Sequence, residues 1–265
     1  MRDNGRSVYY LAKTSFWSVV GRGKMVSLEE KGYWMLRIVI FDSGYGGELL
    51  ADRLKEELPV AEIVRVIDWR NAKKLQSSAR AARSVARSAL RPYIGRVDLI
   101  VFANYLLTAT SLKYFQRKFR GQKFLGVGLT HPGTFCKQHT LILTTTALAK
   151  TMSYRRYLLQ LRRKVDTLCL DTWPELIDDG ELTYDEIRYR LEKFFEKKGY
   201  VSDEIILACS QFKDIENSLR QVTRNRAKIY DSSDDVVCKT CQVLKIRGGA
   251  VRKSKRKSGE LKTRG

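Results

Sequence analysis

The apolar positions of the chain fall into short continuous runs, separated by longer segments with three- and four-residue spacing. Continuous runs bounded by turn residues are typical of buried strands, whereas the wider spacing is typical of helices. The runs stand at 36–40, 62–68, 97–103, 123–128, 140–143, 167–170, 204–208 and 228–232. Because strands alternate with helices, we predict an α/β fold in which mostly parallel sheets carry helices on both faces.

The same alternation runs twice, once from 36 to 128 and again from 140 to 230. The expected helices begin near 48 and 105, end near 154, and span about 71–92, 184–197 and 234–244, with a turn at Trp173-Pro174. No longer repeat in the residues themselves is visible. The pattern therefore predicts two α/β units of similar build.

The two ends of the chain lack this pattern. Residues 1–34 mix glycines, charges and aromatics without sustained periodicity, and Met35 stands immediately before the first predicted strand. We therefore expect the natural domain to start at Met35, after a poorly ordered extension. Residues 246–265 are rich in lysine and arginine, and we expect a disordered basic tail.

Charge and cysteine content narrow the class of protein. The chain has 50 Lys and Arg against 29 Asp and Glu, a net charge of +21 that favours polyanionic or acidic partners. Five cysteines, an odd number, are typical of reduced thiols and predict a cytoplasmic location. No apolar run approaches the length of a membrane span, so no membrane association is expected.

Four arginines, at 80, 83, 87 and 91, follow one face of the helix expected over 71–92. Such a stripe is usually a solvated face, and no aromatic residue is interleaved to stack on bases. The alternative is a row of contacts to a phosphate backbone. Binding of nucleic acid therefore stays an alternative that we do not favour.

A polar turn, Asp42-Ser43-Gly44-Tyr45-Gly46-Gly47, follows the first strand and leads into a helical segment. Open α/β sheets place ligands at the carboxyl ends of their strands, where helix amides attract anions and glycines permit close approach. The turn lacks the Gly-Lys-Ser/Thr of a phosphate loop and the glycine spacing of a dinucleotide site. An ordinary strand-to-helix turn is the alternative at this point.

Two further strands end on polar residues, at Asn104-Tyr105 and at Cys209-Ser210-Gln211. With Phe41 through Gly47, these strand ends resemble the aspartate/glutamate racemase family, most closely glutamate racemase. The order of further residues agrees with the family's motifs: Asp98 through Thr108, Thr144 to Leu148 with Tyr154, Ile206 through Gln211, and Asp231-Ser232. The resemblance spans about 36–245.

The resemblance implies two pseudo-symmetric three-layer α/β domains with the active site in the cleft between them. It also implies that the last segment returns to the first domain, which gives 36–128 plus 231–245 and 129–230. Family members need no cofactor and no metal, and place one cysteine in each domain beside the α-carbon of an acidic amino acid. Inverting that carbon needs a base on one face and an acid on the other, and a thiol serves once a helix N-terminus lowers its pKa.

The chain departs from the family pattern at the catalytic positions. Asn104 stands where the family has its first cysteine, and an amide cannot accept the α-proton. Cys209 keeps the second thiol, but Gln211 replaces the histidine that follows it. The resemblance thus assigns catalytic positions to Cys209, Asp42 and Asn104. Its substrate-binding positions are Asp42, Ser43, Tyr105, Thr145, Ser210 and Gln211.

The remaining cysteines and histidines carry weaker signals. Cys238 and Cys241 have metal-ligand spacing, but no second pair completes four ligands, so packing is the better interpretation. Cys136 and Cys169 are expected to be structural. His139 is too isolated for a catalytic role, whereas His131 follows the fourth strand and is a minor candidate for a replacement base.

Three functions remain open from the sequence. The first is a cofactor-independent racemase-type enzyme acting on a small acidic amino acid or related carboxylate, with two-thiol activity impaired and a one-face reaction favoured. The second is a non-catalytic binding or regulatory module with the same fold. The third is a basic nucleic-acid-associated protein, and a homodimer is an open alternative for the assembly.

Overall fold

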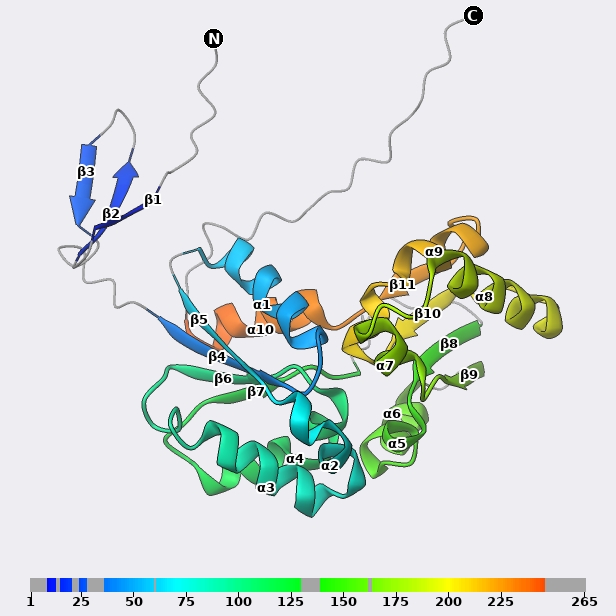
Figure 1. Cartoon of the computed structure of the whole chain (residues 1–265), viewed down its shortest axis with the longest axis horizontal. Helices are drawn as coiled ribbons and strands as arrows, with labels where there is room; N and C mark the ends of the chain where they lie inside the picture. Colours follow the sequence, from blue (N-terminus) through cyan, green and yellow to red (C-terminus); the bar gives the residue numbers. More distant parts are fainter. Residues whose placement is uncertain are drawn as a thin grey trace, which may run out of the picture.

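The computed structural model describes residues 9–12, 15–20, 24–27, 36–59, 61–129, 139–161 and 164–245. Its main body consists of two four-stranded parallel sheets, each covered by helices on both faces (Figure 1). We call them the Asp42 sheet and the Cys209 sheet, after a residue at the end of a central strand of each. A separate three-stranded antiparallel sheet lies near the N-terminus.

The Asp42 sheet has the strand order β5-β4-β6-β7. Its strands are β4 (Arg37–Asp42), β5 (Glu62–Ile67), β6 (Leu99–Phe102) and β7 (Phe124–Gly126). Its helices are α1 (Gly46–Glu57), η1 (Trp69–Asn71), α2 (Ala72–Ser77), α3 (Ala79–Leu90) and α4 (Tyr105–Lys118). The central strand β4 pairs on both sides, with β5 and β6, and its last five residues are buried.

The Cys209 sheet has the order β11-β10-β8-β9. Its strands are β8 (His139–Thr144), β9 (Lys164–Cys169), β10 (Glu204–Leu207) and β11 (Lys228–Tyr230). Helices α5 (Thr146–Ala149), α6 (Met152–Leu161), α7 (Trp173–Asp178), α8 (Tyr184–Lys198), η2 (Ser210–Lys213) and α9 (Glu216–Val222) accompany it. In both sheets the second strand lies outside the first, and the third and fourth follow on the other side. This shared order confirms the predicted doubling of an α/β unit.

Side chains of successive strand residues enter different cores, as strand geometry requires. Val39 and Phe41 face the core under α2–α4, whereas Ile38 and Ile40 face the core shared with α1. That second core continues without a break to Ile142 and the helices α5 and α6 of the Cys209 sheet. One hydrophobic core therefore joins the two halves, while α7–α9 close a third core on the far face.

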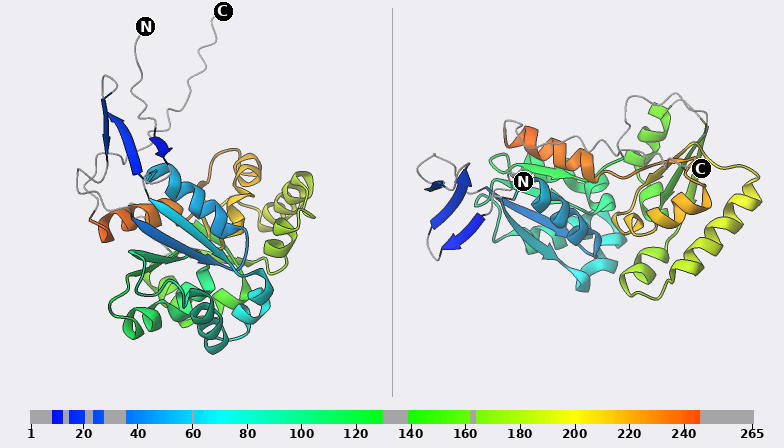
Figure 2. Two further views of the ribbon diagram at one scale, coloured as in Figure 1. Left: turned by 60° about the vertical axis from the view of Figure 1, so that its left-hand side comes forward. Right: turned by 90° about the horizontal axis from the view of Figure 1, so that it is seen from above.

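The last helix, α10 (Ser233–Val243), returns to the Asp42 sheet and packs beside α1 and β7 (Figures 1 and 2). Arg53 on α1 pairs with Asp234 on α10, with 3.2 Å between nitrogen and oxygen. Lys123 Nζ also donates to the carbonyl of Val243 at 3.2 Å. These contacts support the proposal that residues 231–245 belong with 36–128.

The helices differ from the prediction in three places. The helix expected to end near 154 is two helices, α5 and α6, and the second continues to Leu161. The single helix expected over 71–92 is broken at Ser78, whose extended backbone ends α2 and whose Oγ accepts the N–H of Ala81 to cap α3. The turn expected at Trp173-Pro174 instead begins α7, with Pro174 in the first helical turn, where a missing N–H costs nothing. The break at Ser78 reflects side-chain capping and the start of α7 reflects the fit of proline to a first helical turn, and apolar spacing reports neither.

Four further elements were not predicted. Helix α9 follows η2, and strands β1 (Tyr9–Ala12), β2 (Ser15–Val20) and β3 (Lys24–Ser27) occur within the segment 1–34, where no regular structure was expected. The expected disordered tail, 246–265, lies outside the described residues. None of the described helices combines the length and apolarity that crossing a membrane requires.

Candidate active site

Three strand ends from the two sheets meet at Asp42. Asp42 is the last residue of β4 and is only 1% exposed. Its Oδ1 accepts the side-chain amide of Asn104, after β6, at 3.3 Å, and its Oδ2 accepts the hydroxyl of Ser210, after β10, at 3.4 Å. The structure therefore brings together three of the predicted site residues, and it does so across the boundary between the halves.

Glycines allow this close approach. A Cβ on Gly46 would overlap Ser210, and a Cβ on Gly47 would overlap the side chain of Asp42. A Cβ on Gly44 would overlap Gln211 and Asp178. The first turn of α1 thus lies directly against the strand end of the other sheet. Gly44 and Gly46 are therefore needed for this contact between the halves, whereas Gly47 makes room for Asp42 within its own half.

Asn104 uses both ends of its side chain. Its Nδ2 donates to Asp42 and also to Ser43 Oγ at 3.2 Å, while its Oδ1 accepts the N–H of Leu107 at 2.9 Å and caps α4. The cap identifies which atom is the oxygen, because only the oxygen can accept that N–H. Asn104 therefore supports Asp42 and α4, and no atom of it can take up a proton from substrate.

Burial controls the proton affinity of Asp42. Loss of solvent raises its pKa from 3.8 to about 7, although the N–H of Ser43 and the amide of Asn104 both stabilise the carboxylate. The nearby carboxylate of Asp178 raises it further. Asp42 is therefore a carboxyl group that can hold or release a proton near neutral pH, which is the requirement for general acid–base chemistry.

Cys209 differs from the expectation for a catalytic thiol. Burial raises the pKa of its thiol to about 12, and the charges of Asp42 and Asp178 act in the same direction. Its Sγ donates to Gln211 Oε1 at 3.0 Å. The expected lowering of the pKa is not found, because burial outweighs the N–H groups of Gln211 and Ser210, at the start of η2, which favour the thiolate. In this arrangement Cys209 is a protonated thiol.

Gln211 and Asp178 close the site from the side of the Cys209 sheet. Gln211 Nε2 donates to Asp178 Oδ2 at 3.2 Å, and the N–H of Tyr45, at the start of α1, approaches the same oxygen at 3.4 Å. Burial raises the pKa of Asp178. Sequence reasoning missed Asp178, because it ends α7, where a turn was predicted and no family motif applies.

Two predicted substrate-binding residues lie outside this network. The hydroxyl of Tyr105 donates to the carbonyl of Leu207 at 3.0 Å and lies 2.8 Å from Ser232 Oγ, so it ties α4 to the Cys209 sheet. Thr145 caps α5 by accepting the N–H of Leu148 at 3.4 Å. Next to it, the buried hydroxyl of Thr144 has no partner among the described residues.

Among the described residues, the other cysteines and His139 contribute nothing to the cluster around Asp42. Cys169 and Cys238 are exposed, and Cys241 is buried in the core beneath α10, so only the latter meets the expectation of packing. His139 packs against the ring of Tyr200, with 4.9 Å between ring centres. His131 and Cys136 lie outside the described residues.

Comparison with known proteins agrees with this geometry. Glutamate racemase of Bacillus cereus is 24% identical over 220 residues, covering 78% of this chain and 80% of its own. The structure of Campylobacter jejuni glutamate racemase matches with a TM-score of 0.66 and 21% identity, over 78% of this chain and 85% of that chain. Escherichia coli glutamate racemase, solved with L-glutamate and the activator UDP-MurNAc-Ala, matches with a TM-score of 0.65 and 18% identity, over 81% and 84%. No family model matches the chain.

The two parallel sheets of identical strand order match the α/β fold of glutamate racemase structures. The chain is similar to glutamate racemase in sequence and in fold, and its resemblance to the aspartate/glutamate racemase family is confirmed. At these identities the structural matches establish the fold, and the catalytic positions must be judged on their own chemistry.

Proposed function

We propose that this protein is a cofactor-independent racemase-type isomerase that moves a proton at the α-carbon of a small acidic amino acid or related carboxylate. The observation that carries the proposal is Asp42, whose carboxyl has a pKa of about 7 and contacts residues of both sheets. Because Asn104 cannot accept a proton, Asp42 takes the part of the missing base. The family resemblance supplies the substrate class.

Asp42 and Cys209 have complementary proton states. Near pH 7 a substantial share of Asp42 is ionised and can accept the α-proton, whereas the thiol of Cys209 is protonated and can donate one. The two groups belong to different sheets, so a substrate held between the sheets is open to both. Their chemistry therefore suits a reaction in which Asp42, from one half, removes a proton and Cys209, from the other half, returns one.

The step is balanced without an added reagent. The Asp42 carboxylate takes the α-proton, and the electron pair of the broken C–H bond passes into the substrate carboxylate. Cys209 then donates its thiol proton to the α-carbon and becomes a thiolate. Exchange with water resets both groups. Because the resting thiol is strongly protonated, one direction of inversion is expected to be faster than the other, and proton exchange faster than net inversion.

Substrate entry requires the closed contacts to separate. Asp42 is fully buried, and Ser210, Gln211 and Asp178 cover it. The contacts that must break are single hydrogen bonds of 3.2 to 3.4 Å, each of which contributes about 1 kcal/mol. An acidic substrate can replace them with its own carboxylates, which find the N–H of Tyr45 and the Ser210 hydroxyl.

Exchange of the α-proton in heavy water tests the proposal. Purified protein is incubated with each enantiomer of glutamate and aspartate, and loss of the α-proton signal is followed by NMR. We expect exchange that falls at least about a hundredfold in Asp42→Asn. In Cys209→Ala, exchange should persist while inversion is lost. Cys169→Ala, which removes an exposed thiol outside the site, should behave as the parent protein.

A non-catalytic binding module is the second candidate, and the state of Asn104 favours it. All polar atoms of that side chain are already committed to Asp42, Ser43 and Leu107, as expected of a structural position. If this candidate is correct, a dicarboxylate should raise the melting temperature, and neither enantiomer of glutamate or aspartate should exchange its α-proton. That pair of results would overturn the isomerase proposal and retain the ligand class.

A further inference from the structure

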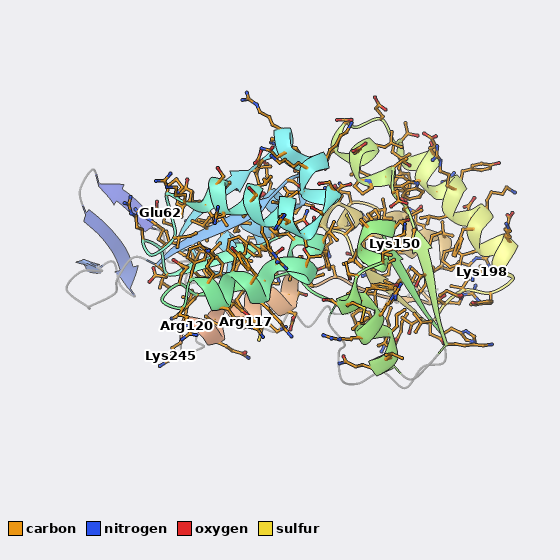
Figure 3. The ribbon with its side chains drawn as sticks, turned by 90° about the horizontal axis from the view of Figure 1, so that it is seen from below. Glu62, Arg117, Arg120, Lys150, Lys198 and Lys245 are labelled. Carbon is orange, nitrogen blue, oxygen red and sulfur yellow. The ribbon has the colours of Figure 1, made fainter. Side chains whose placement is uncertain are left out.

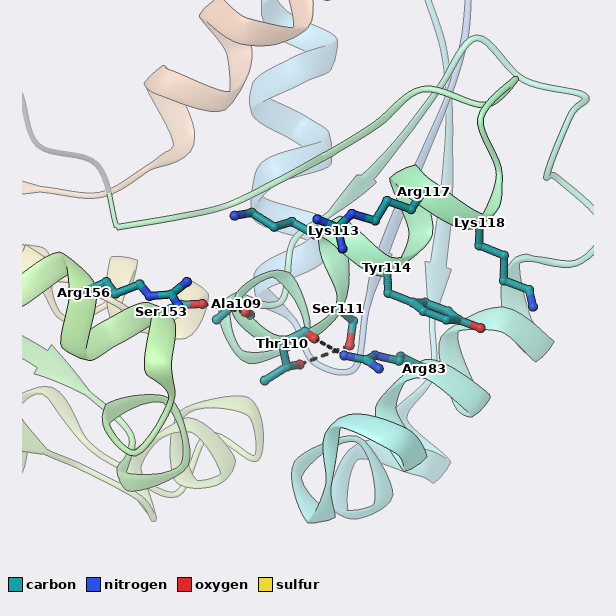
Figure 4. Close-up of a pocket in the computed structure, with 10 residues that line it drawn as sticks. All are labelled: Arg83, Ala109, Thr110, Ser111, Lys113, Tyr114, Arg117, Lys118, Ser153 and Arg156. Carbon is teal, nitrogen blue, oxygen red and sulfur yellow. Dashed lines mark hydrogen bonds between the residues drawn. The ribbon is translucent and has the colours of Figure 1, made fainter.

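A second hollow lies away from the Asp42 cluster, among α3, α4 and α6 (Figure 4). Its volume is about 580 Å³, within the range of small-molecule sites. Its lining is strongly basic, and none of the described residues in it is acidic. The lining residues are Arg83, Ala109, Thr110, Ser111, Lys113, Tyr114, Arg117, Lys118, Ser153 and Arg156.

The five cationic side chains are not neutralised within the part of the chain that the structure describes. None of Arg83, Lys113, Arg117, Lys118 and Arg156 makes an ion pair there, although ion pairs are frequent elsewhere on the surface. Like charges gathered around one hollow repel each other, and this lowers stability unless an anion is present. An anionic ligand bound in the hollow would therefore reduce the repulsion among these five cationic side chains.

Arg83 is held in place and keeps one donor free. Its Nη2 donates to the carbonyl of Thr110 at 2.7 Å, and its guanidinium lies 4.9 Å from the ring centre of Tyr114. Its buried Nε has no hydrogen-bond partner among the described residues. A buried, unsatisfied N–H is unfavourable, and an anionic oxygen in the hollow would satisfy it.

The hollow also spans the two halves. Arg83 lies on α3 and seven of the lining residues lie on α4, both beside the Asp42 sheet, whereas Ser153 and Arg156 lie on α6 beside the Cys209 sheet. Ser153 Oγ donates to the carbonyl of Ala109 at 2.7 Å and closes one edge of the hollow. A ligand that reaches both Arg117 on α4 and Arg156 on α6 would thus link the two halves (Figure 4).

We propose that this hollow binds a phosphorylated small molecule that carries several phosphate charges. Three arginines offer planar donor pairs that match phosphate oxygens, and two lysines add charge without fixed geometry. A nucleic acid strand fits less well. Unspecific strand binding uses free aromatic faces for stacking, whereas Arg83 covers the ring of Tyr114 and Lys118 lies 5.7 Å from it.

The four arginines of the stripe on α3 and directly after it differ in position. Arg83 lines the hollow, but Arg80, Arg87 and Arg91 do not, and all three are exposed. Basic side chains elsewhere, such as Arg120, Lys150 and Lys198, are distributed over both halves (Figure 3). General attraction of anions therefore comes from the whole surface, while the specific site is the hollow.

Binding of inorganic tripolyphosphate to the full chain tests the proposal. The pocket variant is Arg117→Ala/Arg156→Ala, and the matched control is Arg87→Ala/Arg91→Ala, which removes the same charge from exposed positions outside the hollow. All four arginines are exposed, so truncation should leave folding intact, as circular dichroism and the ligand-free melting temperature will show. Melting temperatures and calorimetric titrations are recorded at about 5 mM probe or below.

We expect the probe to raise the melting temperature of the parent and the control equally. In the pocket variant the dissociation constant should rise at least about tenfold. The basic run 245–265 is common to all three proteins and so cannot produce this difference. Equal binding by the two double variants, or no binding by the parent, overturns the proposal. A third result would also overturn it: the parent binds duplex DNA through Arg117 and Arg156 but does not bind tripolyphosphate. That result would indicate a nucleic-acid surface.

Discussion

Asn104 donates its side-chain amide to Asp42, with 3.3 Å between Nδ2 and Oδ1. The orientation of the amide is fixed by the N–H of Leu107, which the Asn104 oxygen accepts at 2.9 Å. A group that should exchange protons with substrate has thus been replaced by one that positions a carboxyl group. Under the proposed function, proton transfer in this half of the site therefore depends on Asp42.

Returning a thiol to this position should increase catalysis. In Asn104→Cys a second proton-transfer group stands beside Asp42, opposite Cys209, so we expect net racemisation of glutamate or aspartate to rise at least about tenfold. Loss of the cap on α4 should lower stability by about 1 kcal/mol. Racemisation is followed by polarimetry. Asn104→Ser keeps a capping oxygen but has no usable acid or base, and an equal rate in both variants would contradict the prediction.

Asp42 should make the protein less stable as pH rises towards neutrality. Its pKa is about 7 in the native state and 3.8 when exposed, so the native state binds the proton more tightly. The stability from this group is complete below pH 4 and is lost between pH 4 and 7, by at most about 4 kcal/mol.

The variant Asp42→Asn should lack this component of the pH profile. Burial raises the pKa values of Asp178 and Asp214, whereas Lys213 lowers that of Asp231, so these groups also contribute. These groups are present in both proteins, so their contributions cancel in the difference between the two free energies of unfolding. Urea unfolding at a series of pH values measures that difference. Parallel profiles for the parent and Asp42→Asn would show that Asp42 titrates normally.

Asp178 should compete with an acidic ligand. Its carboxylate already holds the N–H of Tyr45 and the amide of Gln211, which are positions that suit a substrate carboxylate. We expect Asp178→Ala to bind dicarboxylates several-fold more tightly, because the competing charge is removed and the closed state is weakened. Calorimetric titration with glutarate measures the change. The neighbour Asp179 is exposed, and Asp179→Ala serves as the control; tighter binding in that variant alone would refute the prediction.

Gly46 should tolerate no side chain. A Cβ there would overlap both the Cβ and the Oγ of Ser210 in the other half, so Gly46→Ala should lower stability by about 1–3 kcal/mol. Gly121→Ala is the control, since its Cβ would meet no atom within 4 Å. Adding Ser210→Gly to Gly46→Ala should recover most of the loss. Equal melting temperatures for Gly46→Ala and Gly121→Ala would contradict the close contact between the halves.

The fold was largely predictable because each buried strand is a continuous apolar run. Val39 and Phe41 face one core, and Ile38 and Ile40 face another. Because both faces of the strand are buried, every position is apolar, and the strand can be recognised as a continuous apolar run. The break at Ser78 was not visible in the same way. The break depends on the single hydroxyl of Ser78, which caps α3. The apolar spacing continues past Ser78 without a change, so the sequence pattern gives no sign of the break.

The site was predictable as far as the motifs reached. The strand-end positions of Asp42, Asn104 and Ser210 follow from parallel topology and from the family resemblance, and the structure brings them into contact. Asp178 and the high pKa of Cys209 could not be predicted. Both depend on how tightly the two halves close on each other, and that closure is a property of the tertiary structure alone.

The return of α10 to the Asp42 sheet has a consequence for how the chain is made. Arg53 and Asp234 are 181 residues apart in sequence, yet they pair on adjacent helices. During synthesis, the first sheet and α1 leave the ribosome long before α10 exists to cover them. Apolar side chains beneath α10 therefore stay unprotected until nearly the whole chain has been translated, and the nascent protein should depend on chaperones during that interval.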